Sequence, residues 1–231
     1  MKRILIDVDT QFDFVDPAGS LYVEAPMSVR RAIEMSLREA AARGTPVLGS
    51  VDSHAWDAWE FTENGGPFPA HCVKGSAGWL RVCPHLPART RLVPMQVVDA
   101  RVRNLVGESS AGGGVRELDA RGLAEEALNG VGIFFEKEVY SLFSNPAATP
   151  VLEALVGLMG GKASVVFDVL GYCTGGYCVD AAVRGLLELG YRVRVLAFAT
   201  AAIGGSEGED KSRRELCELG AQWLEVMPEA A

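Results

Sequence analysis

The chain has 231 residues, of which 48% are hydrophobic and 23% charged, and its formal net charge is -8. This length and composition are typical of one well-packed globular domain, which we expect to span residues 1–231. The acidic charge argues against nucleic acid or an anionic membrane surface as a partner. No apolar run reaches the roughly 20 residues that a membrane-spanning helix needs.

The cysteines give an expectation about the cellular compartment. There are five, an odd number, scattered at positions 72, 83, 173, 178 and 217, whereas a small secreted disulfide scaffold usually carries an even number. The N-terminus leads directly into "ILIDVD", whose two aspartates interrupt the apolar run and make it unlike a signal peptide. We therefore predict a cytoplasmic protein with reduced cysteines.

Two predicted strands in the first part of the chain each end in a carboxylate. "RILIDVD" is typical of a buried strand with Asp9 at its end, and "PVLGSVD" of a second strand that ends at Asp52. A helix is predicted between them over 29–43, with Ser28 as its N-cap and Gly44 closing it.

Two segments that follow lack a clear period. Residues 53–92 are rich in Trp, Gly, Pro and His and are predicted to form an ordered loop region, and loops of this length are uncommon unless they are functional. The stretch near 95–128 is interpreted as an insertion in the domain, with a Gly-rich centre and a short helix capped by Asp119.

From residue 131 onward, strands and helices alternate. Strands are predicted at "VGIFFEK", which ends at Lys137, and at "ASVVFDVL", "YRVRVLAFA" and "QWLEVM". Helices are predicted at "TPVLEALVGLM", over 177–189 and at "EDKSRRELCELG". This alternation predicts an α/β fold, a three-layer sandwich whose mostly parallel central sheet has helices on both faces.

Four chemically active positions are predicted to meet at one rim of this sheet. Asp9, Asp52 and Lys137 end three different strands, and the "GYCTGGYC" turn follows a fourth. Because ligands of such sheets bind at the carboxyl ends of the strands, we expect the functional site at this rim.

The turn is suited to a reactive thiol at Cys178. Gly175 and Gly176 allow a tight turn, and Cys178 begins the next predicted helix. Free N–H groups at a helix start, together with the helix dipole, favour a thiolate and can hold an oxyanion. Cys173, at the end of the strand, is interpreted as a packing residue. The alternative for Cys178 is an inert thiol in the core.

Asp9 and Lys137 could supply the proton chemistry that such a nucleophile needs. None of the three histidines is near Cys178 in sequence, so a carboxylate is the candidate proton acceptor, with a lysine adjusting the charge balance. Taken singly, Asp9 could instead cap backbone N–H groups, and Lys137 could be a solvated surface residue.

A candidate metal site follows the second strand and comprises Asp52, His54, Glu60 and His71. The spacing Asp-x-His puts two ligands on the same side of an extended segment, and the other two residues could close the site. Two imidazoles with two carboxylates suit Zn²⁺, Mn²⁺ or Fe²⁺ better than Ca²⁺ or Mg²⁺. The alternative is that these are polar loop residues bonded to the backbone.

Aromatic residues flank these groups, namely Phe14, Trp56, Trp59 and Phe68. They could form an apolar pocket for a flat substrate ring. The alternative is that they only pack the long loop.

Five stretches, in the same order along the chain, resemble the nicotinamidases of the isochorismatase-like cysteine hydrolase family. They are "LIDVDTQFDF", "VDSHAWD", "FPAHCVKGSAG", "EKEVYSLF" and "GYCTGGYCVDAAVRGLLELGYRV". The resemblance covers most of the chain, except the stretch near 95–128. It implies that Cys178 attacks the carboxamide of nicotinamide, that Asp9 carries the thiol proton to the departing ammonia, and that Lys137 stabilises their charged states. A thioester would then be hydrolysed to nicotinic acid.

The resemblance also implies an oxyanion hole formed by the N–H groups of Thr174 and Cys178. In the family a non-proline cis peptide holds one of these groups, and we expect it at the Thr174–Gly175 bond. One divalent ion, held by the candidate metal site, would orient the pyridine ring. Zn²⁺ is the predicted metal, with Mn²⁺ and Fe²⁺ as alternatives. The predicted substrate contacts are Phe14, Phe68 and Tyr177.

Two other functions stay open on the sequence. A relative with the same thiol chemistry could act on another small amide, a ureido compound or an isochorismate-like vinyl ether, and such relatives usually lack the metal set. A binding or thiol-redox protein on the same scaffold would show an ordinary Cys178 thiol or a reversible Cys173–Cys178 bridge. The expected partner is a small aromatic amide, and a homo-oligomer is left open.

Overall fold

The computed structural model describes residues 1–82, 87, 89–95 and 119–226. Within these residues the centre is a seven-stranded sheet with the order β3-β4-β2-β1-β5-β6-β7, and every pair of neighbouring strands is parallel. The strands are β1 (Lys2–Val8), β2 (Val47–Asp52), β3 (Arg89–Val93), β4 (Val131–Lys137), β5 (Val165–Thr174), β6 (Val193–Ala202) and β7 (Gln222–Leu224).

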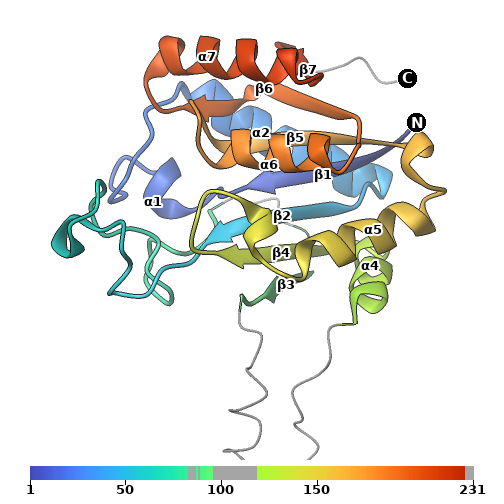
Figure 1. The fold of residues 1–231 in the computed structure, drawn as a ribbon, viewed down its shortest axis with the longest axis horizontal. Coiled ribbons are helices and arrows are strands. Elements are labelled where there is room, and N and C mark those ends of the chain that lie inside the picture. Colours follow the sequence, from blue (N-terminus) through green and yellow to red (C-terminus); the bar gives the residue numbers. More distant parts are fainter. Residues whose placement is uncertain (83–86, 88, 96–118, 227–231) are drawn as a thin grey trace, which may run out of the picture.

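Helices cover both faces of the sheet, as Figure 1 shows. One face carries α2 over a core that includes residues of β1, β2 and β6. The other face carries α4, α5, α6 and α7 over a second apolar core. The predicted three-layer α/β sandwich is therefore confirmed. The helices are α1 (Phe12–Val15), α2 (Met27–Arg43), α4 (Ala120–Leu128), α5 (Ala148–Leu158), α6 (Cys178–Glu188) and α7 (Gly205–Glu218), with short 3-10 turns η1 (Thr62–Asn64), η2 (Leu142–Ser144) and η3 (Lys162–Ser164).

The register of the central strands brings their carboxyl ends level. In β1, Val8 lies opposite Ser50 of β2 on one side and Gly171 of β5 on the other. In the neighbouring pair, Asp52 of β2 lies opposite Lys137 of β4. Side chains that leave the ends of these four strands therefore share one edge of the sheet, as predicted.

The predicted helices are all present, although α7 begins at Gly205, four residues before the predicted segment, and one cap differs. α2 begins at Met27 with Pro26 as its N-cap, so the predicted Ser28 cap is wrong. The proline ring fixes φ near -57° and lets the helix start directly after it, which leaves Ser28 inside the first turn. Gly44 closes the helix in the left-handed conformation, and the Asp119 side chain caps α4 by accepting from the Gly122 N–H.

One strand lies in a segment that the sequence predicts as loop. β3 falls within 53–92 apart from its last residue, and its first four residues are exposed, so it lacks the apolar pattern of a strand. Its pairing with β4 in continuous register decides its structure instead. Of the predicted insertion near 95–128, residues 96–118 lie outside the described residues. None of the helices in the described part of the chain has the length and hydropathy of a membrane span.

Gly49 in β2 provides a test of how closely β2 packs against its neighbours β1 and β4. A Cβ on Gly49 would meet the Asp7 carbonyl and the ring of Phe134. We therefore expect Gly49→Ala to lower the free energy of unfolding by about 2–3 kcal/mol, as overpacking of a core does. Urea unfolding measures this. In the matched control, Gly157→Ala in α5, the added Cβ meets open space, so stability should rise by about 0.5–1 kcal/mol. Equal effects of the two variants would contradict the packing.

Candidate active site

The three residues predicted for catalysis lie together and form the acid–lysine–thiol cluster of Asp9, Lys137 and Cys178. Asp9 directly follows β1, Lys137 is the last residue of β4, and Cys178 is the first residue of α6. Lys137 Nζ lies 2.9 Å from Asp9 Oδ2 and 3.5 Å from Cys178 Sγ. Asp9 and Lys137 are 0% exposed, so the interpretation of Lys137 as a solvated surface residue is wrong.

Burial controls the protonation of this cluster. It raises the pKa of Cys178 well above the usual range, an effect that Lys137 opposes and Asp9 reinforces. It also raises the pKa of Asp9, again opposed by Lys137. For Lys137, burial lowers the pKa, but Asp52 and Asp9 outweigh it, so the ammonium stays charged. A buried thiol whose pKa is raised needs a base to become a nucleophile.

Ser50 orients the carboxylate of Asp9, although it is not among the residues predicted from the sequence. The Ser50 hydroxyl donates to Asp9 Oδ1 at 2.7 Å, while Oδ2 faces Lys137. Asp9 has a φ of 47°, so the backbone turns sharply at this residue. Ser50 comes from the adjacent strand β2, and no periodic signal in the sequence marks it.

For the amide hydrolysis that the sequence resemblance implies, we expect Ser50→Ala to lower kcat about tenfold, because Asp9 would lose the hydrogen bond that fixes its orientation. Steady-state kinetics measure this. Ser50→Thr keeps the hydroxyl and should recover most of the rate. A wild-type kcat in the alanine variant would contradict the role of this bond.

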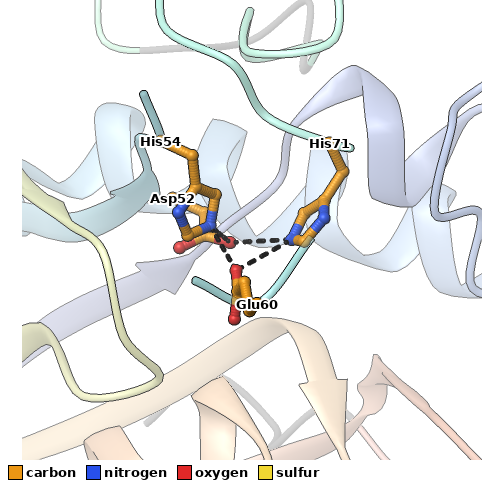
Figure 2. Close-up of side chains that lie close together, drawn as sticks. All are labelled: Asp52, His54, Glu60 and His71. Atoms are coloured by element: carbon orange, nitrogen blue, oxygen red, sulfur yellow. Dashed lines mark hydrogen bonds and ion pairs between the residues drawn. The ribbon is translucent and has the colours of Figure 1, made fainter. Parts of the chain in front are cut away.

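The four predicted metal ligands also converge, and Figure 2 shows their side chains directed toward a common centre. This metal-ligand cluster comprises Asp52, His54, Glu60 and His71, with one ligand atom of each within 4.8 Å of all the others. His54 Nε2 lies 3.0 Å from Asp52 Oδ2 and 2.6 Å from Glu60 Oε1. His71 Nε2 lies 3.4 Å from each of the same two oxygens. All four residues are buried.

The donor set fits a divalent transition-metal ion. Two imidazole nitrogens and two carboxylates are ligands that Zn²⁺, Mn²⁺ and Fe²⁺ accept. His71 Nδ1 donates to the Pro69 carbonyl at 2.8 Å, which directs Nε2 into the cluster, as is usual for metal-bound histidines. Burial lowers the pKa of His54, but hydrogen bonds with Asp52 and Glu60 outweigh it and raise the pKa to about 9. The carboxylates thus favour positive charge at the centre of the cluster.

Asp52 joins the two clusters. Its Oδ1 accepts from Lys137 Nζ at 2.9 Å, while Oδ2 faces the histidines. Gln11 holds the backbone of Asp52, since Gln11 Oε1 accepts from the Asp52 N–H at 2.7 Å and Gln11 Nε2 donates to the Asp52 carbonyl at 2.8 Å. Gln11 was not predicted as a site residue, because the sequence does not show that this polar side chain is buried.

Aromatic rings enclose His71 on several sides. The ring centroids of Phe14, Phe61 and Phe68 lie 5.6, 5.5 and 6.0 Å from that of His71. Phe68 also lies 6.3 Å from Tyr177, centroid to centroid. Two of the three predicted substrate contacts, Phe14 and Phe68, therefore border the metal-ligand cluster, together with Phe61, which was not predicted, and Tyr177 lies against Phe68.

Two other aromatic residues do not contribute to such a pocket. The side chains of Trp56 and Trp59 are 75% and 62% exposed. The interpretation of these two residues as pocket walls is wrong, because the loop turns them toward solvent. Tyr140, which was not predicted, lies next to Tyr177, with their ring centroids 5.4 Å apart.

The turn before Cys178 differs from the prediction in one bond. The non-proline cis peptide lies at Tyr172–Cys173 and not at Thr174–Gly175. It falls inside β5, where the register against β6 is irregular. The turn itself is made by Gly175 and Gly176 with φ of 97° and 100°, which glycine adopts without a cis bond. Thr174 is the buried last residue of β5.

Cys173 is buried in the apolar core on the α2 face, which agrees with the packing role predicted for it. The cysteines in the described part of the chain, Cys72, Cys173, Cys178 and Cys217, are all free. The reversible Cys173–Cys178 bridge of the thiol-redox alternative is therefore not formed in this structure.

No protein-family model and no curated protein matches the chain, but solved structures match nearly all of it. The pyrazinamidase of Pyrococcus horikoshii in complex with zinc is 22% identical, with 98% of this chain and 100% of that chain covered and a TM-score of 0.66. The nicotinamidase/pyrazinamidase from Bacillus subtilis is 20% identical, with 97% and 100% covered and a TM-score of 0.65. The N-carbamoylsarcosine amidase from Thermoplasma acidophilum is 20% identical, with both chains fully covered and a TM-score of 0.62.

The chain has the fold of these amidases. Each of them aligns from end to end with this chain, so the likeness includes the sheet, the covering helices and the rim where the two clusters lie. The fold that the sequence resemblance implies is therefore confirmed. The side chains at the rim determine which reaction this fold supports.

Proposed function

We propose that this chain is a metal-containing cysteine amidohydrolase that converts nicotinamide to nicotinic acid and ammonia. The observation that carries the proposal is that Asp52 belongs to the metal-ligand cluster and also bonds to Lys137 of the acid–lysine–thiol cluster. The thiol, its acid and its lysine therefore lie directly beside the metal ligands. Thiol, base and metal-type ligands in one buried site are the parts that hydrolysis of a pyridine carboxamide needs. The similarity in fold to a nicotinamidase and two other amidases supports the same reaction class.

In the first half of the reaction, Cys178 Sγ attacks the carboxamide carbon and the C=O electron pair moves onto oxygen. Asp9 takes the thiol proton, because burial raises the pKa of the Cys178 thiol and a base is then needed to remove its proton. Lys137 keeps a positive charge beside the reacting sulfur. The N–H groups of Thr174 and Cys178 would hold the oxyanion. The C–N bond then breaks, and the nitrogen leaves as ammonia with the proton from Asp9.

In the second half, water hydrolyses the thioester on Cys178. Asp9 is again a carboxylate and takes a proton from the water as its oxygen attacks the acyl carbon. The C–S bond breaks, the sulfur takes the proton from Asp9, and nicotinic acid is released. The enzyme returns to its resting state with a neutral thiol.

The metal-ligand cluster would hold one divalent ion, which supplies a Lewis acid for the pyridine nitrogen. Zn²⁺ is the proposed metal, since the pyrazinamidase of similar fold is described in complex with zinc, and Mn²⁺ and Fe²⁺ suit the same donors. Phe14, Phe68 and Tyr177 would contact the substrate ring. The position of Phe14 and Phe68 beside His71, and of Tyr177 beside Phe68, supports this.

Ammonia release tests the proposal. Protein reconstituted separately with Zn²⁺, Mn²⁺ and Fe²⁺ is expected to release one ammonia and one nicotinic acid per nicotinamide consumed. No release with any of the three metals would contradict the proposal. Release from an N-carbamoyl compound but not from nicotinamide would select the alternative, a hydrolase with the same thiol chemistry and another small substrate.

A further inference from the structure

A buried serine on a polar helix has no role in the reaction above. α7 has the sequence "GSEGEDKSRRELCE", yet Ser212 is 0% exposed. Its hydroxyl does not bond within its own helix, the usual choice of a helical serine. Instead Ser212 Oγ accepts from the Gly175 N–H at 2.7 Å and donates to Asp180 Oδ1 at 2.6 Å. This hydroxyl therefore connects α7 with the turn that precedes the nucleophile.

Asp180 is a second buried polar residue without a role in the reaction. It is the third residue of α6, two positions after Cys178. Burial raises the pKa of Asp180, while the Ser212 hydroxyl and the Gly176 N–H lower it in part. A hydrogen-bonded pair of side chains, from α6 and α7, thus holds the Gly175 N–H of the turn.

The turn also packs closely on the segment that leads into α7. The Ile203 N–H donates to the Thr174 carbonyl at 3.2 Å. A Cβ on Gly175 would meet the Ile203 carbonyl, and one on Gly208 would meet that carbonyl and the Gly175 Cα. Glycine alone leaves the backbone free to rotate at 175 and 176, so the conformation of the turn depends on these outside contacts.

We propose that Ser212 and Asp180 are positioning residues, whose hydrogen-bonded pair fixes the Gly175–Gly176 turn and thereby aims the Thr174 and Cys178 N–H groups at the carbonyl oxygen of the substrate. The inference rests on the proposed function for the identity of that carbonyl. The two N–H groups stand on either side of the turn, so rotation at either glycine changes the distance between them. Misplacement by about 1 Å can lower a rate on the order of 100-fold.

Three substitutions test the proposal through kinetics. Ser212→Ala should lower kcat for nicotinamide about 10- to 100-fold and change KM less than about threefold, because two of the three proposed ring contacts, Phe14 and Phe68, lie on other elements. Asp180→Ala should behave alike, whereas Asp180→Asn keeps an oxygen for the serine and should stay within about threefold of the wild-type kcat. If Ser212→Ala does not fold, the comparison of Asp180→Ala with Asp180→Asn tests the positioning role instead.

Ser36→Ala is the matched control. Ser36 is also a buried serine on a helix, and its hydroxyl has no hydrogen-bond partner within the described ranges. It lies in α2, on the opposite face of the sheet. The control should leave kcat unchanged. A wild-type kcat in Ser212→Ala, or an equal loss in Ser36→Ala, would overturn the proposal.

A measurement without substrate separates this inference from the proposed function. Amide hydrogen exchange at Gly175 and Gly176, followed by NMR, should be at least about tenfold faster in Ser212→Ala than in wild type and unchanged in Ser36→Ala. If wild type fails to hydrolyse nicotinamide while exchange rises as expected, the substrate is wrong and the fixed turn stands. If nicotinamide is hydrolysed but exchange and kcat are the same in Ser212→Ala and wild type, the positioning role is wrong.

Discussion

Replacing Cys178 with alanine is expected to abolish ammonia release from nicotinamide, lowering kcat by a factor on the order of 10⁵. Without the thiol no thioester can form, and the remaining groups can only assist direct attack by water. The loss should fall on kcat because the predicted ring contacts and the metal-ligand cluster do not include this side chain. Steady-state ammonia release measures it, together with the metal content of the purified variant.

Cys173→Ala is the matched control for this prediction. Cys173 is a second buried cysteine, five positions earlier, that lies in the core on the α2 face. Its removal should leave kcat within about tenfold of wild type. Turnover by Cys178→Ala above about 1% of the wild-type rate would show that the thiol is not the nucleophile. A variant that lost its metal as well would point to a structural role.

Replacing Lys137 with methionine is expected to lower the free energy of unfolding by about 3–5 kcal/mol and to abolish turnover. Lys137 Nζ lies 2.9 Å from a carboxylate oxygen of both Asp9 and Asp52, and all three residues are buried. Methionine has a similar length but no charge, so two carboxylates would be left close together without compensation. Removing one partner of a buried ion pair commonly has an effect of this size. Urea unfolding of the metal-free protein measures it.

Two further variants make this prediction specific. Lys74 also pairs with a carboxylate, Glu136, at 2.6 Å, but its side chain is 53% exposed. Lys74→Met should therefore lower stability by less than about 1 kcal/mol. Adding Asp9→Asn to Lys137→Met should restore part of the lost stability, since one uncompensated charge is removed. If Lys137→Met and Lys74→Met have the same free energy of unfolding, the buried ammonium of Lys137 does not stabilise the site.

The sequence predicts the rim of the sheet well because the physics behind it is local. Apolar runs that end in a charged residue place Asp9, Asp52 and Lys137 at strand ends, and parallel strands bring such ends to one edge. β3 follows a different rule. Its exposed arginines and threonine have no alternating pattern, and only pairing with β4 makes it a strand.

Contacts between distant side chains are what the sequence does not predict. Gln11 and Ser50 hold Asp52 and Asp9 across adjacent strands. Ser212 reaches a turn 37 positions earlier. Such hydrogen bonds depend on where two elements come to lie and leave no period in the sequence. The metal-ligand cluster is predictable only in part. The spacing of Asp52 and His54 follows from strand geometry, but Glu60 and His71 come from a long loop whose path the sequence does not define.

The strand order has a consequence for how the molecule becomes active during synthesis. The central strand β1 is made first, yet it pairs with β2 on one side and with the much later β5 on the other. A chain that emerges from the ribosome N-terminus first therefore displays Asp9 and all four metal ligands well before Cys178 exists. The acid–lysine–thiol cluster is therefore complete only after β5 has paired with β1 and α6 has followed it, and the nascent chain exposes no assembled cluster before that event.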